Sequence, residues 1–330
     1  NSGKILPYRF FMRVLVTGGC GFIGHRVVYL LEKQGHDVLV VDNHTTYGSI
    51  QSDELVDLVK ERKRFIKSKV LTTDICDFVA LYKAVEFDPD VVVHLASFPR
   101  QKSVDINPQE GVKTMMEGLL NVLEISKNRR LIYISSSMVY GDMNGPAKED
   151  DPCNPKGLYA IMKYTGEKMV KDYGRRFGMG YNIIRPSAVY GPRDVGDRVI
   201  AKFLLNARIG KPLRVNGKEE KLDFSFVDDT ASGICRVTNL GLPNETYNIT
   251  RGHARTIYDA ACCVRDIVGE GKVIVQEKDS KFPSRDALCI DKAREQLGYN
   301  PTTNLEEGLQ SYYDWFTEFY DQVHWFTASV

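Results

Sequence analysis

The sequence predicts an α/β fold built on a doubly wound parallel sheet, with a smaller lobe formed by the C-terminal part of the chain. Two observations predict the sheet. Short runs rich in β-branched residues alternate with helical patterns, and a glycine-rich turn joins the first strand directly to a helix. A third observation predicts the lobe, because helix and strand signals become irregular beyond about residue 180. A chain of 330 residues can bury a core of this size.

The expected elements follow in chain order. Arg13 to Thr17 is a first strand, and the helical pattern from His25 to Gln34 stops at Gly35. Further helices are expected to begin at Tyr159 and among the aromatic residues near the C-terminus, and turns are expected at Gly210 and Asn216-Gly217. Short apolar runs predict buried strands at Val38 to Val41, Val91 to Val93, Leu131 to Ile134 and Asn182 to Arg185.

The composition argues against several functional classes. There are 44 basic and 43 acidic side chains, so the net charge of +1 gives no reason to expect nucleic acid or an anionic membrane as a partner. Seven cysteines form no C-x-x-C pair, which is typical of a reduced, cytoplasmic protein. The six histidines show no ligand spacing, so no metal is expected. No apolar run approaches the roughly 20 residues that a membrane span needs.

The turn after the first strand has the spacing G-x-x-G-x-x-G, from Gly18 through Gly21 to Gly24. Glycines between a strand and a helix let a pyrophosphate approach the backbone N–H groups at the helix N-terminus, although the same spacing also suits a tight turn without a ligand. Asp42 ends the second strand, where a carboxylate can accept hydrogen bonds from a ribose diol and would repel a 2′-phosphate. The glycine turn and Asp42 together favour NAD over NADP as the cofactor.

A second group of residues suggests base catalysis. Ser136 follows the strand ending at Ile134, and Tyr159 precedes Lys163 by one helical turn, so the two side chains share a face. We expect the Lys163 ammonium to lower the pKa of the Tyr159 phenol below its ordinary value of about 10, so that the phenolate can act as a general base. Taken alone, a tyrosine and a lysine at this spacing more often merely decorate a helix surface.

Several motifs occur in one order: TGGCGFIG, VVDN, TTDICD, VVVHLAS, SSSMVYG, Tyr159-x-x-x-Lys163 and RPSAVYGPR. Together they resemble the extended short-chain dehydrogenase/reductase family, and within it the nucleotide-sugar epimerases typified by UDP-glucose 4-epimerase, over residues 13 to about 310. The resemblance implies a Rossmann domain at 12–180 after an extension at 1–11. It also implies a substrate lobe at 181–330, from which the chain crosses back to the sheet around 181–190 and 223–250.

The resemblance implies a role for individual residues. Ser136, Tyr159 and Lys163 would be catalytic. The NAD site would comprise Gly18, Gly21, Phe22, Ile23, Gly24, Asp42, Asn43, His44, Asp74, Ile75, Leu95, Ala96, Ser97, Ser135, Tyr159, Lys163, Pro186 and Ser187. The site for a nucleotide-diphosphate sugar would comprise Arg100, Ser136, Ser137, Met138, Tyr159, Ala188, Val199, Lys202, Arg214, Asn216, Lys221 and Arg285.

The sequence departs from the family pattern at several substrate positions. Ala188 stands where the family usually has Asn, Met115 replaces another frequent Asn, and Leu222 stands where an Arg is usual, which Lys221 or Arg214 could replace. Arg285 suits a diphosphate, because its guanidinium can bind two oxygens at once, but it could also be a surface residue. These changes leave the sugar and the nucleotide unassigned.

The residues after Ser136 bear on the reaction. Dehydratases and decarboxylases of the family usually have Asp-Glu or Ser-Glu there, whereas this chain has Ser137 and Met138, and a thioether cannot carry a proton. Asp142 or Glu149 could stand in for the missing acid. We therefore expect an NAD-dependent epimerase, most simply a 4-epimerase. The alternatives are a nucleotide-sugar ketoreductase or dehydrogenase with net redox, and a non-catalytic cofactor sensor.

The resemblance also suggests a homodimer, since family members often pair through two helices. Here these would be the helices around Pro108 to Ser126 and Tyr159 to Tyr173. Met115, Leu119 and Val122 could serve either such an interface or the core of the chain itself.

Overall fold

The structure is a computed structural model that describes residues 11–45, 52–278 and 283–322. Most of the expected N-terminal extension and the last eight residues of the aromatic C-terminal segment lie outside these ranges. The expected C-terminal helix is present as α12 (Leu305–Gln322).

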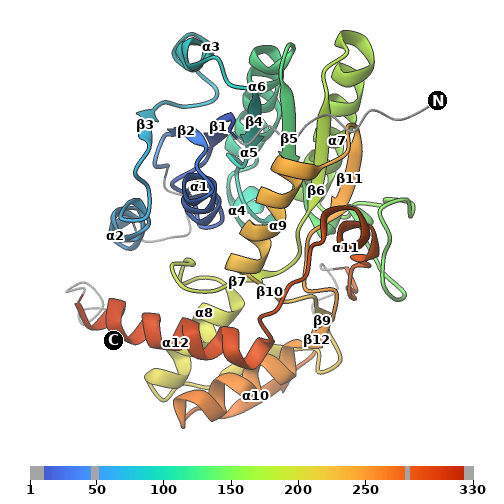
Figure 1. The fold of residues 1–330 in the computed structure, drawn as a ribbon. Coiled ribbons are helices and arrows are strands. Elements are labelled where there is room, and N and C mark those ends of the chain that lie inside the picture. Colours follow the sequence, from blue (N-terminus) through green and yellow to red (C-terminus); the bar gives the residue numbers. More distant parts are fainter. Residues whose placement is uncertain (1–10, 46–51, 279–282, 323–330) are drawn as a thin grey trace.

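A seven-stranded, fully parallel sheet forms the centre of the molecule (Figure 1). Its strand order is β11-β6-β5-β4-β1-β2-β3, so the order reverses between β1 and β4. Ligands of such sheets bind where the order reverses, beyond the carboxyl ends of the strands. The strands are β1 (Arg13–Thr17), β2 (Asp37–Asp42), β3 (Lys69–Thr72), β4 (Val91–His94), β5 (Arg130–Ile134), β6 (Tyr181–Arg185) and β11 (Glu245–Asn248).

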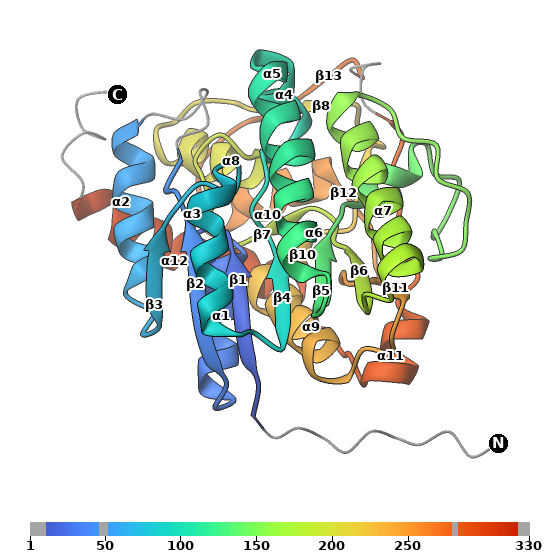
Figure 2. The same ribbon diagram turned by 90° about the horizontal axis from the view of Figure 1, so that it is seen from above.

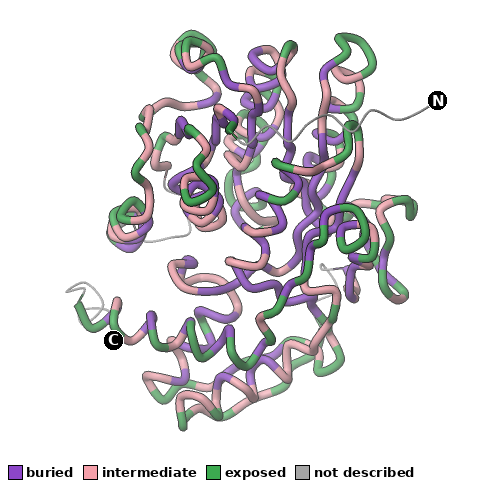
Figure 3. The backbone as a smooth tube through the Cα atoms, viewed as in Figure 1, coloured by how far each residue is buried: buried purple, intermediate pink, exposed green. Residues whose placement is uncertain are grey.

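Helices cover both faces of the sheet, because successive side chains of each strand point to opposite faces. Val14 and Val16 belong to the core that contains residues of α1, α9 and α11, whereas Leu15 between them belongs to the core that contains residues of α3, α6 and α7. Figure 2 shows the sheet from above, and Figure 3 shows that the buried backbone follows the strands. The six helices are α1 (Gly24–Lys33), α3 (Phe78–Tyr82), α6 (Gly118–Ser126), α7 (Leu158–Phe177), α9 (Val227–Leu240) and α11 (Asp291–Leu297). The doubly wound α/β prediction is confirmed.

The segment before α6 is irregular. It consists of α4 (Gln101–Ile106), α5 (Pro108–Val112) and a π-helical turn, Lys113–Glu117. Met115, Leu119 and Val122 are all buried in the core of the chain itself, so the choice between interface and core is decided in favour of the core. Val112 and Leu120, in contrast, are exposed.

The C-terminal half of the chain builds a second apolar core below the sheet in Figure 1. Phe203 and Leu204 of α8 (Val199–Arg208), Val264 of α10 (Ile257–Val268) and Leu309 and Phe316 of α12 meet in it. Three short strand pairs accompany these helices: β7 (Val189–Tyr190) with β10 (Ser225–Phe226), β8 (Leu213–Asn216) with β13 (Val273–Gln276), and β9 (Lys221–Leu222) with β12 (Arg255–Thr256).

One carboxylate links the two halves. Glu54 lies in α2 (Ser52–Lys63), beside the edge of the sheet formed by β2 and β3. Its Oε1 accepts hydrogen bonds from the backbone N–H of Gly196 at 2.7 Å and from the hydroxyl of Tyr320 in α12 at 2.7 Å. The α2 helix, the loop before α8 and the end of α12 are therefore joined at one point.

Candidate active site

The glycine turn packs so closely against the chain's own backbone that a side chain would not fit at two of its positions. Gly18 has φ +73°, and a Cβ there would lie 2.6 Å from the backbone nitrogen of Ala96. A Cβ on Gly24 would lie 2.1 Å from the carbonyl oxygen of Gly18. No side chain caps the N-terminus of α1 at Ile23, so the partial positive charge of that helix end is available to an anion. These features fit a pyrophosphate.

Two carboxylates are held at the ends of β2 and β3. Asp42 accepts hydrogen bonds from the backbone N–H groups of Cys20 at 2.9 Å and His44 at 2.8 Å, which ties the end of β2 to the glycine turn. Asp74 accepts one from the side-chain amide of Asn43 at 2.9 Å. The two carboxylates line the same cavity at neighbouring strand ends.

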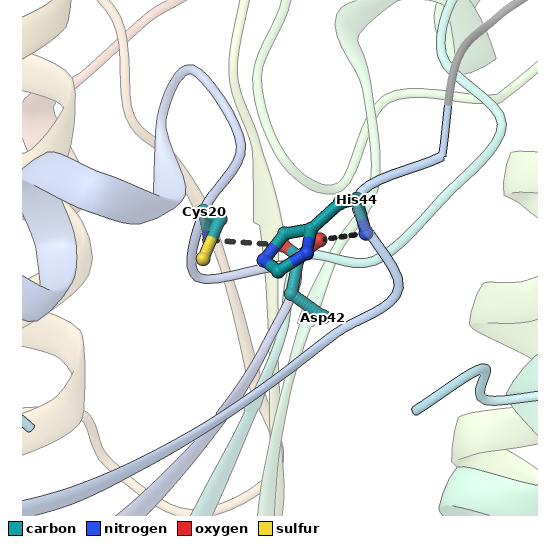
Figure 4. A group of neighbouring side chains, drawn as sticks. All are labelled: Cys20, Asp42 and His44. Atoms are coloured by element: carbon teal, nitrogen blue, oxygen red, sulfur yellow. Dashed lines mark hydrogen bonds between the residues drawn. The ribbon is translucent and has the colours of Figure 1, made fainter. Parts of the chain in front are cut away.

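Cys20, Asp42 and His44 also form a group whose donor atoms all lie within 4.8 Å of one another, the range in which a metal ion could be held (Figure 4). Burial, and then the neighbouring Asp42, raise the pKa of the Cys20 thiol to about 12, so the thiolate that a metal prefers is scarce at neutral pH. Both oxygens of Asp42 already accept backbone hydrogen bonds. Both features argue against a metal ion at this group.

Ser136, Tyr159 and Lys163 come together at the carboxyl ends of β5 and β6. The Ser136 hydroxyl accepts a hydrogen bond from the backbone N–H of Met138 at 3.2 Å, and Ser136 and Tyr159 line the same cavity. The Lys163 ammonium donates to the carbonyl of Ile134 at 2.8 Å and lies 6.0 Å from the centre of the Tyr159 ring. The backbone N–H of Tyr159 donates to Oε1 of Gln101 at 3.2 Å, so α4 fixes the start of α7.

The predicted lowering of the Tyr159 pKa is wrong for this structure. Burial raises the pKa of Tyr159, and this outweighs the lowering by the neighbouring Ser136 hydroxyl and by the charges of Arg198 and Arg100. Burial also lowers the pKa of Lys163 to about 7, so much of this amine is uncharged at neutral pH and contributes little positive charge. The sequence showed that the two residues are close, but it did not show that both are desolvated.

A buried ion pair joins the elements that carry Ser136, Tyr159 and Lys163. Both nitrogens of one edge of the Arg185 guanidinium donate to Glu167, at 2.9 and 2.7 Å, and the Ser135 hydroxyl donates to the same carboxylate at 2.6 Å. Arg185 ends β6, Ser135 follows β5, and Glu167 lies one turn after Lys163 on α7. The pair thus joins the three elements that carry the Ser–Tyr–Lys set.

One cavity contains all the residues that the sequence assigned to NAD, from Gly18 in the glycine turn to Ser187 after β6. Of the residues assigned to the substrate, Arg100, Ser136, Tyr159 and Ala188 also line it. Ala188 has a positive φ of +34°, a conformation that Asn tolerates better than Ala. The remaining substrate candidates do not line this cavity: Ser137, Met138, Val199, Lys202, Arg214, Asn216, Lys221 and Arg285.

Those remaining candidates contact residues outside the cavity lining or next to it, or they face outward. Ser137 donates to the hydroxyl of Ser187 at 3.1 Å, and the Arg285 guanidinium lies 3.8 Å from the sulfur of Met138, which places Arg285 near the catalytic strand end. Lys221 pairs with Asp286 at 3.7 Å. Arg214 and Asn216 are on the exposed side of β8, and Val199 and Lys202 are in the first turn of α8.

Sequence reasoning missed several residues that line the cavity. Leu55, Val59 and Arg62 come from α2, and Asp194 and Arg198 come from the loop before α8. No motif pointed to them, because they reach the cavity only through contacts distant in sequence, such as that from the Arg62 guanidinium to the Arg193 carbonyl at 2.7 Å.

The fold and the cavity define a dinucleotide-binding α/β protein with a Ser–Tyr–Lys set beside the cofactor site. The chain belongs to the NAD dependent epimerase/dehydratase family, whose model matches residues 14–250. It is therefore an NAD-dependent enzyme of that family, and the prediction of NAD as cofactor is confirmed.

Relatives of two activities are similar to this chain. A protein of Bacillus subtilis described as an uncharacterized UDP-glucose epimerase is 31% identical, covering 90% of this chain and 96% of that protein. A probable dTDP-glucose 4,6-dehydratase of Sinorhizobium fredii is 30% identical, covering 93% of each. Among solved structures, the UDP-glucuronic acid 4-epimerase of Bacillus cereus with UDP-glucuronic acid and NAD is 27% identical with a TM-score of 0.85, covering 93% of this chain and 99% of that one.

Proposed function

We propose that this protein is a nucleotide-sugar 4-epimerase that oxidises a sugar alcohol to a keto-sugar and then reduces it from the opposite face. The observation that carries the proposal is the Ser136–Tyr159–Lys163 set, which lines the same cavity as the glycine turn and is followed by Ser137 and Met138 rather than by an acid. Similarity to epimerases over nearly the whole chain supports it.

In this scheme each residue has one task. Tyr159 removes the hydroxyl proton at its phenolic oxygen, and the Ser136 hydroxyl holds the sugar oxygen in place. Lys163 supports the phenolate in its protonated form and binds the ribose next to the nicotinamide. Bound NAD would supply the reversible hydride acceptor for this chemistry. Because the nucleotide stays anchored while the sugar turns, the product differs only in configuration.

The two acids that could have replaced the missing glutamate are used elsewhere. Asp142 pairs with Lys156 and accepts a hydrogen bond from the backbone N–H of Ser284 at 2.9 Å. Glu149 accepts one from the backbone N–H of Asn248 at 2.9 Å. Neither lines the cavity. Elimination of water therefore lacks the acid that the family's dehydratases place after the serine.

Purified, NAD-loaded protein incubated with UDP-, dTDP-, GDP- and CDP-sugars tests the proposal. We expect a second sugar isomer by NMR with no net change in NADH absorbance. Steady formation or consumption of NADH would instead support a ketoreductase or dehydrogenase. Loss of one water from the sugar, seen by mass spectrometry, would support a dehydratase, the activity named for the Sinorhizobium relative. Tyr159→Phe should retain NAD and lose turnover.

We further propose a homodimer. Val112 and Leu120 in the segment before α7, and Ile161 on α7, are 45, 42 and 46% exposed, which is unusual for large apolar side chains on neighbouring helices. Leu120→Asp should convert a dimer to a monomer in light scattering.

The division into an NAD-binding domain up to residue 180 and a mainly substrate-binding remainder agrees with the separate apolar core of the C-terminal half. Seven free cysteines suit a reducing cytoplasm, and none of the described helices could span a membrane.

A further inference from the structure

The Lys163 ammonium is buried without a carboxylate partner among the described residues. The residue is 6% exposed, and its nitrogen donates to the carbonyl of Ile134 at 2.8 Å. Glu167, one turn further along α7, is bound instead to Arg185. His94 on β4 is neutral near pH 7, because burial, and then the charge of Lys163, lower its pKa to about 3. A buried positive charge in this place needs another source of stabilisation.

The aromatic ring of Tyr133, on β5, faces this ammonium. The Lys163 nitrogen lies 5.5 Å from the centre of the Tyr133 ring, closer than the 6.0 Å to the Tyr159 ring. Tyr133 is itself buried, and its hydroxyl donates to the backbone carbonyl of Lys163 at 3.3 Å. A cation within about 6 Å of a ring centre is attracted to the ring face, most strongly where water is excluded. Tyr133 therefore contacts both the backbone and the charged end of Lys163.

Residues of three other elements hold the Tyr133 ring in this position. A Cβ on Gly166 of α7 would lie 2.2 Å from the Tyr133 hydroxyl oxygen, so only glycine leaves room for the phenol. Glycine is unfavourable inside a helix, and this close approach gives a physical reason for it here. The His94 ring is stacked on Tyr133 with ring centres 6.0 Å apart, and His94 is hydrogen-bonded to the hydroxyl of Thr17, the last residue of β1, at 2.7 Å.

We propose that Tyr133 is a positioning residue of the active site, whose ring stabilises the protonated form of Lys163 through a cation–π contact. Among the described residues this contact takes the place of a carboxylate, which would attract the ammonium away from Tyr159. The ring is neutral, so it favours the charge on Lys163 without adding a negative charge that would oppose the Tyr159 phenolate. The inference rests on the proposed function, in which the phenolate needs that ammonium.

Trifluorophenylalanine at position 133 tests the contact, because fluorine withdraws electron density from the ring face and nearly keeps the ring's shape. It is compared with Tyr133→Phe in the NAD-loaded protein. The pKa of Lys163 is measured by carbon NMR of protein labelled at the lysine Cε atoms, and Lys163→Met assigns the signal. A weaker contact favours the neutral amine, so the pKa of Lys163 should be about one unit lower with the trifluorinated ring. A single fluorine, similar in size to the hydroxyl, should give an intermediate shift.

Tyr164 on the same helix is the matched control. Its ring lies 4.7 Å from the nitrogen of Lys168, which is exposed, so the same replacements at position 164 should leave the pKa of Lys163 unchanged. An equal pKa of Lys163 with the plain and the fluorinated rings at position 133 would overturn the inference. So would an equal fall with fluorine at position 164, because the shift would then not come from the Tyr133 ring. Absence of epimerisation by the wild type would instead refute the proposed function alone, since the NMR titration needs no substrate.

Discussion

The buried pair of Glu167 and Arg185 makes a strong prediction about stability. The two side chains are 0 and 3% exposed and share two hydrogen bonds of 2.9 and 2.7 Å. Glu167→Gln keeps the shape of the side chain but leaves the arginine charge buried without a counter-ion. Removing one partner of a buried pair costs about 3–5 kcal/mol, a large part of the roughly 5–15 kcal/mol by which folded proteins are stable.

Equilibrium urea unfolding followed by near-ultraviolet circular dichroism measures the change, with the denaturant slope as a check on two-state behaviour. Asp172→Asn on the same helix is the matched control. It disrupts pairs in which Arg175 and Arg176 are 79 and 60% exposed, so it should cost no more than about 1 kcal/mol. Replacing both buried partners, with Glu167→Leu and Arg185→Met, should cost less than Glu167→Gln alone. A loss for Glu167→Gln no larger than that of the control would refute this reasoning.

Three further predictions concern the cofactor site. Gly24→Ala places a methyl group 2.1 Å from the Gly18 carbonyl oxygen, so NAD affinity measured by calorimetry should fall at least about tenfold in a folded protein; unchanged affinity would contradict the role of the turn. Asp42→Ala should weaken NAD by about 1.5–3 kcal/mol, the range for hydrogen bonds to a charged group, and weaken NADP less; an unchanged NAD-to-NADP ratio in fluorescence titrations would argue against a ribose contact. The pKa of Lys163 falls from 10.5 unfolded to about 7 folded, so between these values the unfolded chain holds a proton that the folded chain has released. Stability of the cofactor-free protein should therefore rise with pH across that window, by up to about 1.4 kcal/mol per unit from this group, and this contribution should be flat below pH 7. Lys163→Met should remove that slope, and identical pH dependence of the two proteins would disprove it.

The sequence predicted the parts of the site that depend on local spacing. These parts are the glycine turn between β1 and α1, the carboxylate that ends β2, and the Tyr159–Lys163 pair. Each is defined by a short stretch of sequence in which strand or helix geometry fixes where the side chains lie. The strands in the middle of the sheet could be predicted equally well, because strands that are buried on both faces are continuous apolar runs in the sequence. The edge strands could not be predicted from the sequence in this way. β3 is only partly buried, and β11, with the sequence ETYN, buries Asn248 through hydrogen bonds to the carbonyls of Ala147 and Cys289.

The substrate side was predicted less well, for two physical reasons. Arg62 and Arg198 reach the cavity through tertiary contacts that no spacing in the sequence reveals. The pKa of Tyr159 depends on burial that only the assembled fold supplies. The positive φ of Arg100, +75°, likewise becomes visible only in the folded chain.

The carboxylate of Glu54 has a consequence for how the molecule comes apart. It holds α2, which lines the cofactor cavity, to Tyr320, near the end of the described part of α12. Trp315 lies in the same aromatic cluster as Tyr320, and their rings meet edge to face with centres 6.4 Å apart. Loosening of the C-terminal helix would therefore disturb the part of the cavity that α2 lines, and in a Trp325→Phe variant the emission of Trp315 would report that opening.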